Sequence, residues 1–156
     1  MLITVGRRVR KMANIFDVAK YILEKLGEMS TWKLQKLCYY AQAWELAWTG
    51  GTPLFPEDFQ AWRNGPVCRE LFDAHKGKFS IKASDLPYGN SEILTSDQKE
   101  DIDIVIRDYG NMQPYELREQ THSEDPWIEA RGGLPDYVNC ENVISKPSIA
   151  YYYGSL

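Results

Sequence analysis

The chain has 156 residues, of which 44% are hydrophobic and 13% aromatic, and its formal net charge is -4. This length and composition predict one folded domain and exclude a disordered chain. The acidic balance argues against nucleic acid as the main partner, because phosphate binding needs a basic face. No stretch approaches the roughly 20 apolar residues of a membrane span, so we expect no membrane partner.

Three cysteines and a basic N-terminal segment frame the domain. Cys38, Cys68 and Cys140 are far apart and odd in number, which favours reduced thiols and a cytoplasmic location over a disulfide framework. Residues 1–12 start with an apolar run and continue with several basic residues. We expect a flexible basic leader there and a folded domain at 13–156.

Two helices are predicted next in the chain. Asn14 is a good N-cap and Gly27 a good C-terminal stop for a helix between them. Ser30 or Thr31 begins a second helix, which we expect to run to about Trp48. Its apolar positions predict one core-facing stripe, made of Leu34, Leu37, Cys38, Ala41, Trp44 and Trp48.

The middle of the chain contains many turn residues. Prolines and an Asn-Gly pair indicate repeated turns over 52–67, with an extended stretch at 59–62. We expect Pro66 to open a third helix that ends at Gly77. Residues 78–94 are predicted to be a loop with short strands near Phe79 to Ile81 and at Ile93.

The C-terminal part predicts four more helical segments. Thr95 and Gln98 match a capping box that opens a helix ending at Gly110. Pro114 opens a short helix, Asp125 caps another, and the last ten residues form a short helix or an edge segment. The prediction is therefore a mainly α, single compact domain of about six or seven short helices, with a minor β-hairpin or short strands within 59–94.

The motifs of common enzymes are absent from this sequence. It contains no Gly-rich phosphate loop, nucleophile elbow, zincin helix or EF-hand loop, and only two histidines. Cys68, His75, His122 and Cys140 offer a Cys₂His₂ zinc site in principle, but structural zinc sites usually contain close ligand pairs. We favour buried packing positions on one helix face for Cys68 and His75, and we expect no metal and no cofactor.

Residues 121–127, THSEDPW, allow two interpretations. His122 beside Asp125 suggests acid-base chemistry, which leaves a hydrolase as a third-ranked hypothesis. We favour a helix-to-helix corner in which Thr121, Ser123 and Asp125 bond to backbone amides and Trp127 anchors the corner in the core. No second catalytic group is evident, so we do not expect an enzyme.

Segment 33–48 is unusually aromatic. Tyr39, Tyr40 and Trp32 fall off or at the margin of the expected stripe, and amphipathic rings near a surface are typical anchors of protein interfaces. This pattern favours a binding protein. It also predicts that Trp44→Ala destabilises the fold by about 3–5 kcal/mol, whereas Tyr40→Ala leaves melting little changed and weakens partner binding.

Three long blocks then resemble a known family. KLQKLCYYAQAWELA, FQAWRNGPV and YGNMQPYELREQTHSEDPWIEAR are similar, in order and spacing, to the Panacea domain of the SocA-like antitoxins, also described as phage-associated proteins. The resemblance covers about 14–153. It implies structural motif positions at Leu34, Leu37, Trp44, Gly65, Pro66, His122, Pro126 and Trp127.

The resemblance implies a cytoplasmic, non-enzymatic antitoxin from a bacterial chromosome, prophage or phage. Such a protein neutralises a protein toxin, encoded by an adjacent gene, through direct contact. The alternative is a proteolytic adaptor that delivers the toxin to a cytosolic protease. We expect the contact surface on helix 33–48 and the neighbouring turn, at Lys36, Tyr39, Tyr40, Trp62, Arg63 and Asn64. For Trp62, Gly65 and Pro66 a purely architectural role remains the alternative.

Overall fold

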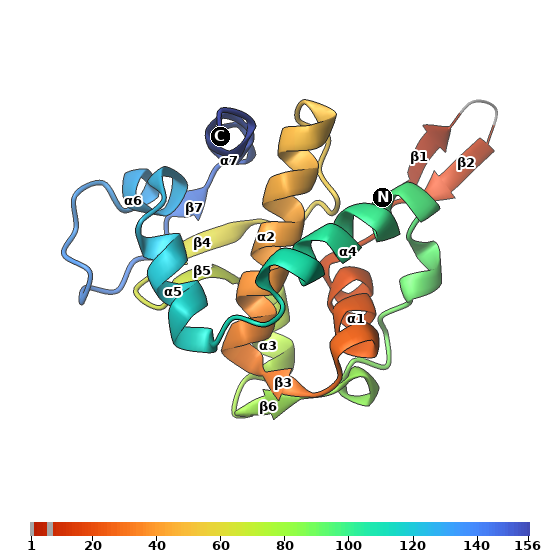
Figure 1. Cartoon of the computed structure of the whole chain (residues 1–156), viewed down its shortest axis with the longest axis horizontal. Helices are drawn as coiled ribbons and strands as arrows, with labels where there is room; N and C mark the ends of the chain where they lie inside the picture. The colour runs from red at the N-terminus through yellow and green to blue at the C-terminus, as the bar shows by residue number, and fades with distance from the viewer. Residues whose placement is uncertain (1, 6–7) are drawn as a thin grey trace.

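Helix α2 is the centre of the molecule, and the other elements pack around it (Figure 1). The computed structural model describes the backbone of residues 2–5 and 8–156. These residues form seven α-helices, which confirms the prediction of a mainly α domain. The helices are α1 (Ile15–Leu26), α2 (Thr31–Thr49), α3 (Arg69–His75), α4 (Ser96–Tyr109), α5 (Pro114–His122), α6 (Asp125–Arg131) and α7 (Lys146–Gly154).

Seven short strands form three small antiparallel sheets in the described part of the chain. They are β1 (Leu2–Val5), β2 (Arg8–Lys11), β3 (Met29–Ser30), β4 (Phe59–Trp62), β5 (Gly65–Cys68), β6 (Ser80–Ile81) and β7 (Val143–Ile144). The largest sheet has the order β5–β4–β7. Strand β7 has no sequence signal of its own beyond two β-branched residues, and it was not predicted.

The N-terminal segment pairs β1 with β2 at the outer end of the molecule (Figure 1). The flexibility of the basic leader stays a prediction. The side chains of residues 1–10 lie outside the described part of the structure. Ile93, expected in a strand, instead ends a 3₁₀ turn at Ser91–Ile93.

Local capping chemistry sets the starts of α1, α2 and α4 as predicted. The Asn14 side chain accepts hydrogen bonds from the backbone N–H groups of Phe16 and Asp17, at 2.9 and 3.0 Å. The Asp17 carboxylate accepts one in return from the Asn14 N–H at 2.9 Å, which completes a capping box. Ser30 caps α2, and Thr95 opens α4 with the expected capping box.

Pro66 does not open a helix, so that prediction is wrong. Strands β4 and β5 form a hairpin in which Trp62 pairs with Gly65 and Pro66 lies opposite Ala61. Because β5 is at the edge of its sheet, a residue without an N–H is tolerated there. Helix α3 begins only at Arg69. Cys68, on β5, therefore does not share a helix face with His75.

Helix α2 is buried on all sides, which a single core-facing stripe did not predict. Every residue from 34 to 43 is buried, and α1, α4, α5, α7 and β5 all pack against the helix. Tyr39 is 1% exposed and Tyr40 is fully buried, so the prediction that their rings lie near the surface is wrong. Trp44 is half-buried, and Trp48 is 46% exposed.

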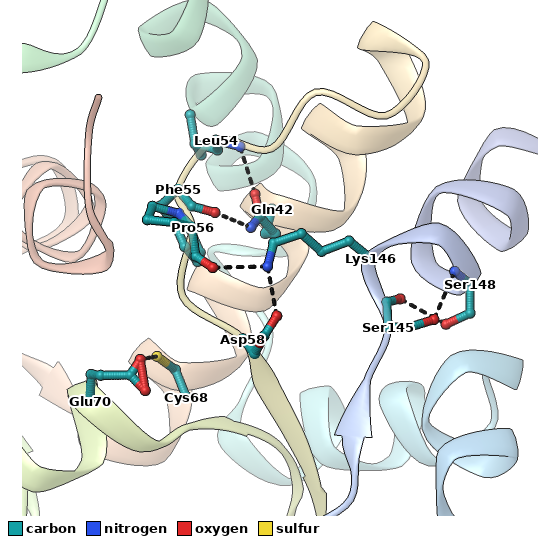
Figure 2. Close-up of polar contacts among 10 residues, drawn as sticks. All are labelled: Gln42, Leu54, Phe55, Pro56, Asp58, Cys68, Glu70, Ser145, Lys146 and Ser148. Carbon is teal, nitrogen blue, oxygen red and sulfur yellow. Dashed lines mark hydrogen bonds and ion pairs between the residues drawn. The ribbon is translucent and has the colours of Figure 1, made fainter. Parts of the chain in front are cut away.

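Two buried glutamines one heptad apart on α2 bind the backbone of neighbouring segments. Gln42 accepts from the Leu54 N–H and donates to the Phe55 carbonyl, both at 2.7 Å (Figure 2). Gln35 accepts from the Cys68 N–H at 2.8 Å and donates to the Cys68 carbonyl at 3.2 Å. These bonds position the segment that enters β4 and the end of β5, because buried backbone groups require partners.

Lys146, at the start of α7, also holds the segment before β4. Its Nζ donates to the Pro56 carbonyl at 2.9 Å and to the Asp58 carboxylate at 2.6 Å (Figure 2). The Ser145 hydroxyl caps α7 by accepting from the Ser148 N–H. The C-terminal helix is thereby attached to the β4–β5 sheet as well as to α2.

Glu124 joins three helices through a buried hydrogen-bond network. It is 4% exposed, and its Oε1 accepts from the hydroxyls of Tyr40 and Tyr153 at 2.7 and 2.8 Å. The Gln120 amide donates to the other oxygen at 3.2 Å. Tyr40 also stacks on Tyr109 of α4, with ring centroids 4.0 Å apart. Burial and the Glu124 charge raise the pKa of the Tyr40 phenol, so it remains a neutral donor.

This network predicts that Tyr40→Ala is a strongly destabilising change. The substitution removes a fully buried ring and a hydrogen bond to a buried carboxylate, so we expect a loss of about 3–5 kcal/mol in the free energy of unfolding. Chemical denaturation of the purified variant measures it. Tyr151→Ala is the matched control, because Tyr151 is 80% exposed and should change stability by at most about 0.5 kcal/mol. Equal stabilities of the two variants would contradict the placement of Tyr40 in this buried network.

Candidate protein-interaction groove

Two adjoining surface hollows share Trp32 and Asn64, and we call them together the Trp32 groove. The outer hollow encloses about 450 Å³ and is further lined by Trp62, Arg63, Phe72 and Asn139. The inner hollow encloses about 200 Å³ and is further lined by Lys36, Pro114, Tyr115 and Arg118. The groove thus collects residues from α2, the β4–β5 turn, α3 and α5.

A row of aromatic rings forms the floor of the outer hollow. Trp62 meets Phe72 edge-on with ring centroids 4.9 Å apart, and Phe72 lies 6.3 Å from Trp32. The Arg69 guanidinium lies 5.7 Å from the Trp62 ring and 5.9 Å from the Phe72 ring. Partly exposed tryptophan and arginine side chains are the residue types that dominate binding energy at protein interfaces.

The groove is positively charged although the chain as a whole is acidic. Lys36, Arg63 and Arg118 line it, and no Asp or Glu is among its described lining residues. Lys36 is 1% exposed, its Nζ has no hydrogen-bond partner among the described residues, and the Trp32 ring lies 5.4 Å away. Burial, with the Arg118 charge adding to it, lowers the pKa of Lys36 to about 7.

The structure brings together four of the six predicted contact residues. Lys36, Trp62, Arg63 and Asn64 line the groove, whereas the buried Tyr39 and Tyr40 do not. That the four residues contact a partner stays a prediction. Trp32, expected only as a ring at the margin of the α2 stripe, lines both hollows. The sequence reasoning missed Phe72, Tyr115 and Arg118, because they lie on two other helices, α3 and α5. The available signal was the aromatic and basic character of these residues, without any indication of their proximity.

The stretches AWRNGPV and THSEDPW, which lie far apart in the sequence, meet directly behind the groove. The Trp127 indole N–H donates to the Trp62 carbonyl at 2.8 Å, and the Arg131 guanidinium donates to the Ala61 carbonyl at 2.8 Å. A Cβ added at Gly65 would lie 2.6 Å from Lys36 Cε and 2.9 Å from Thr121 Oγ1. The corner at α5 and α6 therefore holds the β4–β5 turn in place.

The model of the family described as antitoxin SocA-like, Panacea domain, matches residues 34–128, which is more than half of the chain. The chain belongs to this family. No curated protein matches it, and no solved structure matches it.

The Panacea match contains the Trp127–Trp62 and Gly65–Lys36 contacts but not Arg131, and it is narrower than the expected 14–153. It starts within α2 and ends within α6, so α1 and α7 lie outside it. Tyr153 of α7 nevertheless completes the Glu124 network. The folded unit thus extends beyond the matched residues.

The THSEDPW corner is built differently from the prediction. Thr121 and Ser123 donate to the carbonyls of Arg118 and Gln120, at 2.9 and 2.7 Å, instead of accepting from backbone amides. The N-cap of α6 is Glu124, one residue before the predicted Asp125. Trp127 is 2% exposed, which confirms it as a core anchor.

His122 stacks on Trp127 instead of pairing with an acid. Their ring centroids are 3.8 Å apart, and His122 Nε2 is buried without a hydrogen-bond partner among the described residues. Burial, followed by the Arg118 charge, lowers the pKa of His122 to about 4, so the imidazole is neutral at pH 7. The geometry provides no hydrogen-bonded His–Asp pair at this corner.

The described residues also bear on the metal and membrane questions. Within residues 2–5 and 8–156, no group of three or more His, Cys, Asp or Glu side chains is arranged to hold a metal ion. Cys68 and His75 are linked instead through Gln35, whose amide nitrogen lies 3.0 Å from His75 Nε2. No described helix combines the length and the apolar character needed to cross a membrane.

The contact between Lys36 and the β4–β5 turn yields a direct test. Gly65 and Gly51 have similar backbone angles, φ +105° and +117°, but only Gly65 has side-chain atoms within 4 Å of an added Cβ. Both Gly→Ala changes impose backbone strain, and Gly65→Ala adds steric overlap. We expect Gly65→Ala to lower the unfolding free energy by about 1–3 kcal/mol more than Gly51→Ala, as measured by chemical denaturation. Equal losses would contradict the close approach.

The buried ammonium predicts an unusual stability profile. The unfolded chain keeps Lys36 protonated to about pH 10.5, whereas the folded protein releases the proton near pH 7. The free-energy cost of burying the Lys36 amine on folding therefore has its full value below pH 7, and this cost shrinks as the pH rises toward 10.5. We expect Lys36→Met to stabilise the protein by about 2–4 kcal/mol at pH 7, with a smaller gain at pH 9–10.

Denaturation at several pH values measures that gain. The exposed Lys76 provides the matched control, and Lys76→Met should be neutral at every pH. A Lys36→Met variant that is destabilised, with no dependence on pH, would show that the ammonium has a partner or is solvated.

Proposed function

We propose that this protein is the antitoxin of a toxin–antitoxin pair and that it neutralises a protein toxin, encoded by an adjacent gene, by direct binding. Membership of the SocA-like antitoxin family supports the antitoxin role and favours a non-enzymatic protein. The Trp32 groove is the structural observation that carries the binding mechanism. It offers tryptophan and arginine anchors on a rigid scaffold, which is what a stoichiometric inhibitor requires.

The groove would be the anchor of a larger contact surface. A stable protein complex buries about 800 Å² on each partner, which is more than two small hollows supply. Nanomolar affinity corresponds to about 12 kcal/mol, and a few buried anchors commonly provide most of that free energy. All three cysteines are buried and free, which supports a reducing, cytoplasmic setting for this role.

Co-expression with the product of the adjacent gene tests the proposal. We expect the protein to restore growth in cells that express the toxin and to co-purify with it in a stoichiometric complex. Failure to restore growth, with both proteins soluble and abundant, would reject the antitoxin role. Restored growth with a shortened toxin half-life and no stable complex would favour the proteolytic-adaptor alternative.

Charge reversal in the groove tests where the toxin binds. Arg63 is an exposed residue of the outer hollow, and Arg107 is an exposed arginine on α4 that does not line the groove. We expect Arg63→Glu to weaken toxin binding at least about tenfold, whereas Arg107→Glu leaves it unchanged. Titration calorimetry with the purified toxin provides the dissociation constants. Equal affinities for both variants would place the contact surface elsewhere.

A further inference from the structure

The inner hollow of the Trp32 groove contains a cation that nothing in the described structure neutralises. Lys36 is almost completely buried, and its Nζ has no hydrogen-bond partner there. The second cation, Arg118, is 41% exposed, and its one ion pair within the described structure is with the carboxylate of its neighbour Glu119, which is 70% exposed. Such an exposed pair is worth little, so the Arg118 guanidinium is available to another anion.

Packing does not explain why a lysine occupies position 36. A buried charge without a counter-ion is unfavourable by several kcal/mol, and a methionine would fill a similar volume without that penalty. The neighbouring titratable groups also provide no counter-charge for the Lys36 ammonium. Arg118 and His122 from α5 and His75 from α3 face Lys36, and none of these three groups carries a negative charge.

The shape of the groove indicates how an anion could reach this site. The inner hollow, about 200 Å³, shares Trp32 and Asn64 with the outer hollow, about 450 Å³. A chain that places one side chain in the inner hollow can therefore continue over the aromatic floor of the outer one. A small inorganic anion would use only the inner hollow and leave the aromatic row without a role.

We propose that the inner hollow binds the carboxylate of an aspartate or glutamate side chain within an extended segment of the partner protein, where it pairs with Lys36 and Arg118. The residues next to that acid lie against Trp62 and Phe72 in the outer hollow. This inference rests on the proposed function for the identity of the partner, but the site itself can be tested without the toxin.

Binding of a carboxylate at this site is linked to proton uptake. Free Lys36 loses its proton near pH 7, and a carboxylate beside it raises that pKa by favouring the charged form. Affinity therefore falls as the pH rises above 7, by up to about tenfold per unit until the pKa of the complex is reached. His75 and His122 have lowered pKa values, so both are neutral in this range and do not contribute to the change.

NMR of the full chain with ¹³C-labelled lysine tests the site directly. The Cε signal that disappears in Lys36→Met identifies Lys36, and its chemical shift follows the protonation of Nζ. We expect millimolar amounts of a hexapeptide of alternating glutamate and glycine to raise the Lys36 pKa by about one unit or more. The matched peptide of alternating glutamine and glycine should leave it unchanged.

Three outcomes of this titration overturn the proposal. They are no shift with either peptide, the same shift with both, or a shift with inorganic phosphate that equals the one with the acidic peptide. The last result would indicate a general anion site.

Arg118→Gln, which replaces a partly exposed residue and should fold normally, must reduce the response to the acidic peptide. An undiminished response would remove Arg118 from the site.

The same variants separate this inference from the proposed function. If the wild-type protein binds the toxin, Lys36→Met and Arg118→Gln should each weaken the complex at least tenfold, whereas Lys76→Met should not. A toxin complex that neither variant weakens leaves the antitoxin role intact and rejects the carboxylate site. If the wild-type protein binds no toxin, the antitoxin role fails, and the peptide titration still decides whether the carboxylate site exists.

Discussion

The structure depends on one helix, α2, being enclosed on every side. A helix in that position cannot reserve one face for solvent, so its polar side chains must find partners inside the protein. Gln35 and Gln42 bond to the backbone of β5 and of the segment before β4. Tyr40 bonds to Glu124. Each of these bonds fixes a different surrounding segment, and α2 therefore determines where the rest of the chain lies.

Two side chains of α2 depart from this rule, because Lys36 Nζ and Glu45 Oε2 have no hydrogen-bond partner among the described residues, and Lys36 is the one that lines the groove. Gln35, Tyr40 and Gln42 have such partners. Gly65 approaches Lys36 so closely that a Cβ would overlap Lys36 Cε. The β4–β5 turn is thus built around the lysine stem. A destabilising charge that the surrounding backbone accommodates is typical of a binding site, because stability and function compete there.

Local sequence signals predicted the starts of three helices, and long-range contacts decided features that those signals left open. Asn14, Ser30 and Thr95 cap helices as expected, since capping depends on residues within one turn. Pro66 was misassigned because a proline is compatible with both a helix start and an edge strand, and pairing with β4 decides between them. Tyr40 was placed near the surface because the pattern of one helix does not reveal how many elements surround it.

In the candidate site, too, the local features could be predicted from the sequence, whereas the contacts between distant segments could not. The chemical character of Trp62, Arg63 and Asn64 is visible in the sequence, and the turn signal of Asn64 and Gly65 lies where the hairpin reverses, with Gly65 at a positive φ of 105°. Their proximity to Trp32 and Arg118 depends on α3 and α5 packing against α2 and the β4–β5 sheet. No pattern within a single segment encodes that arrangement.

Family-motif residues and groove-lining residues overlap in this protein without being the same set. Trp62 belongs to both sets, because its carbonyl accepts from Trp127 while its side chain lines the outer hollow. Arg63 and Tyr115 are exposed and have no such bond in the described structure, so substitutions there can change the groove without disturbing the core. Trp32 and Lys36 belong to the enclosed helix and are fixed by the fold. A groove with fixed anchors and an exposed rim can change its partner preference through the rim alone, since specificity is a difference in affinity set by a few side chains.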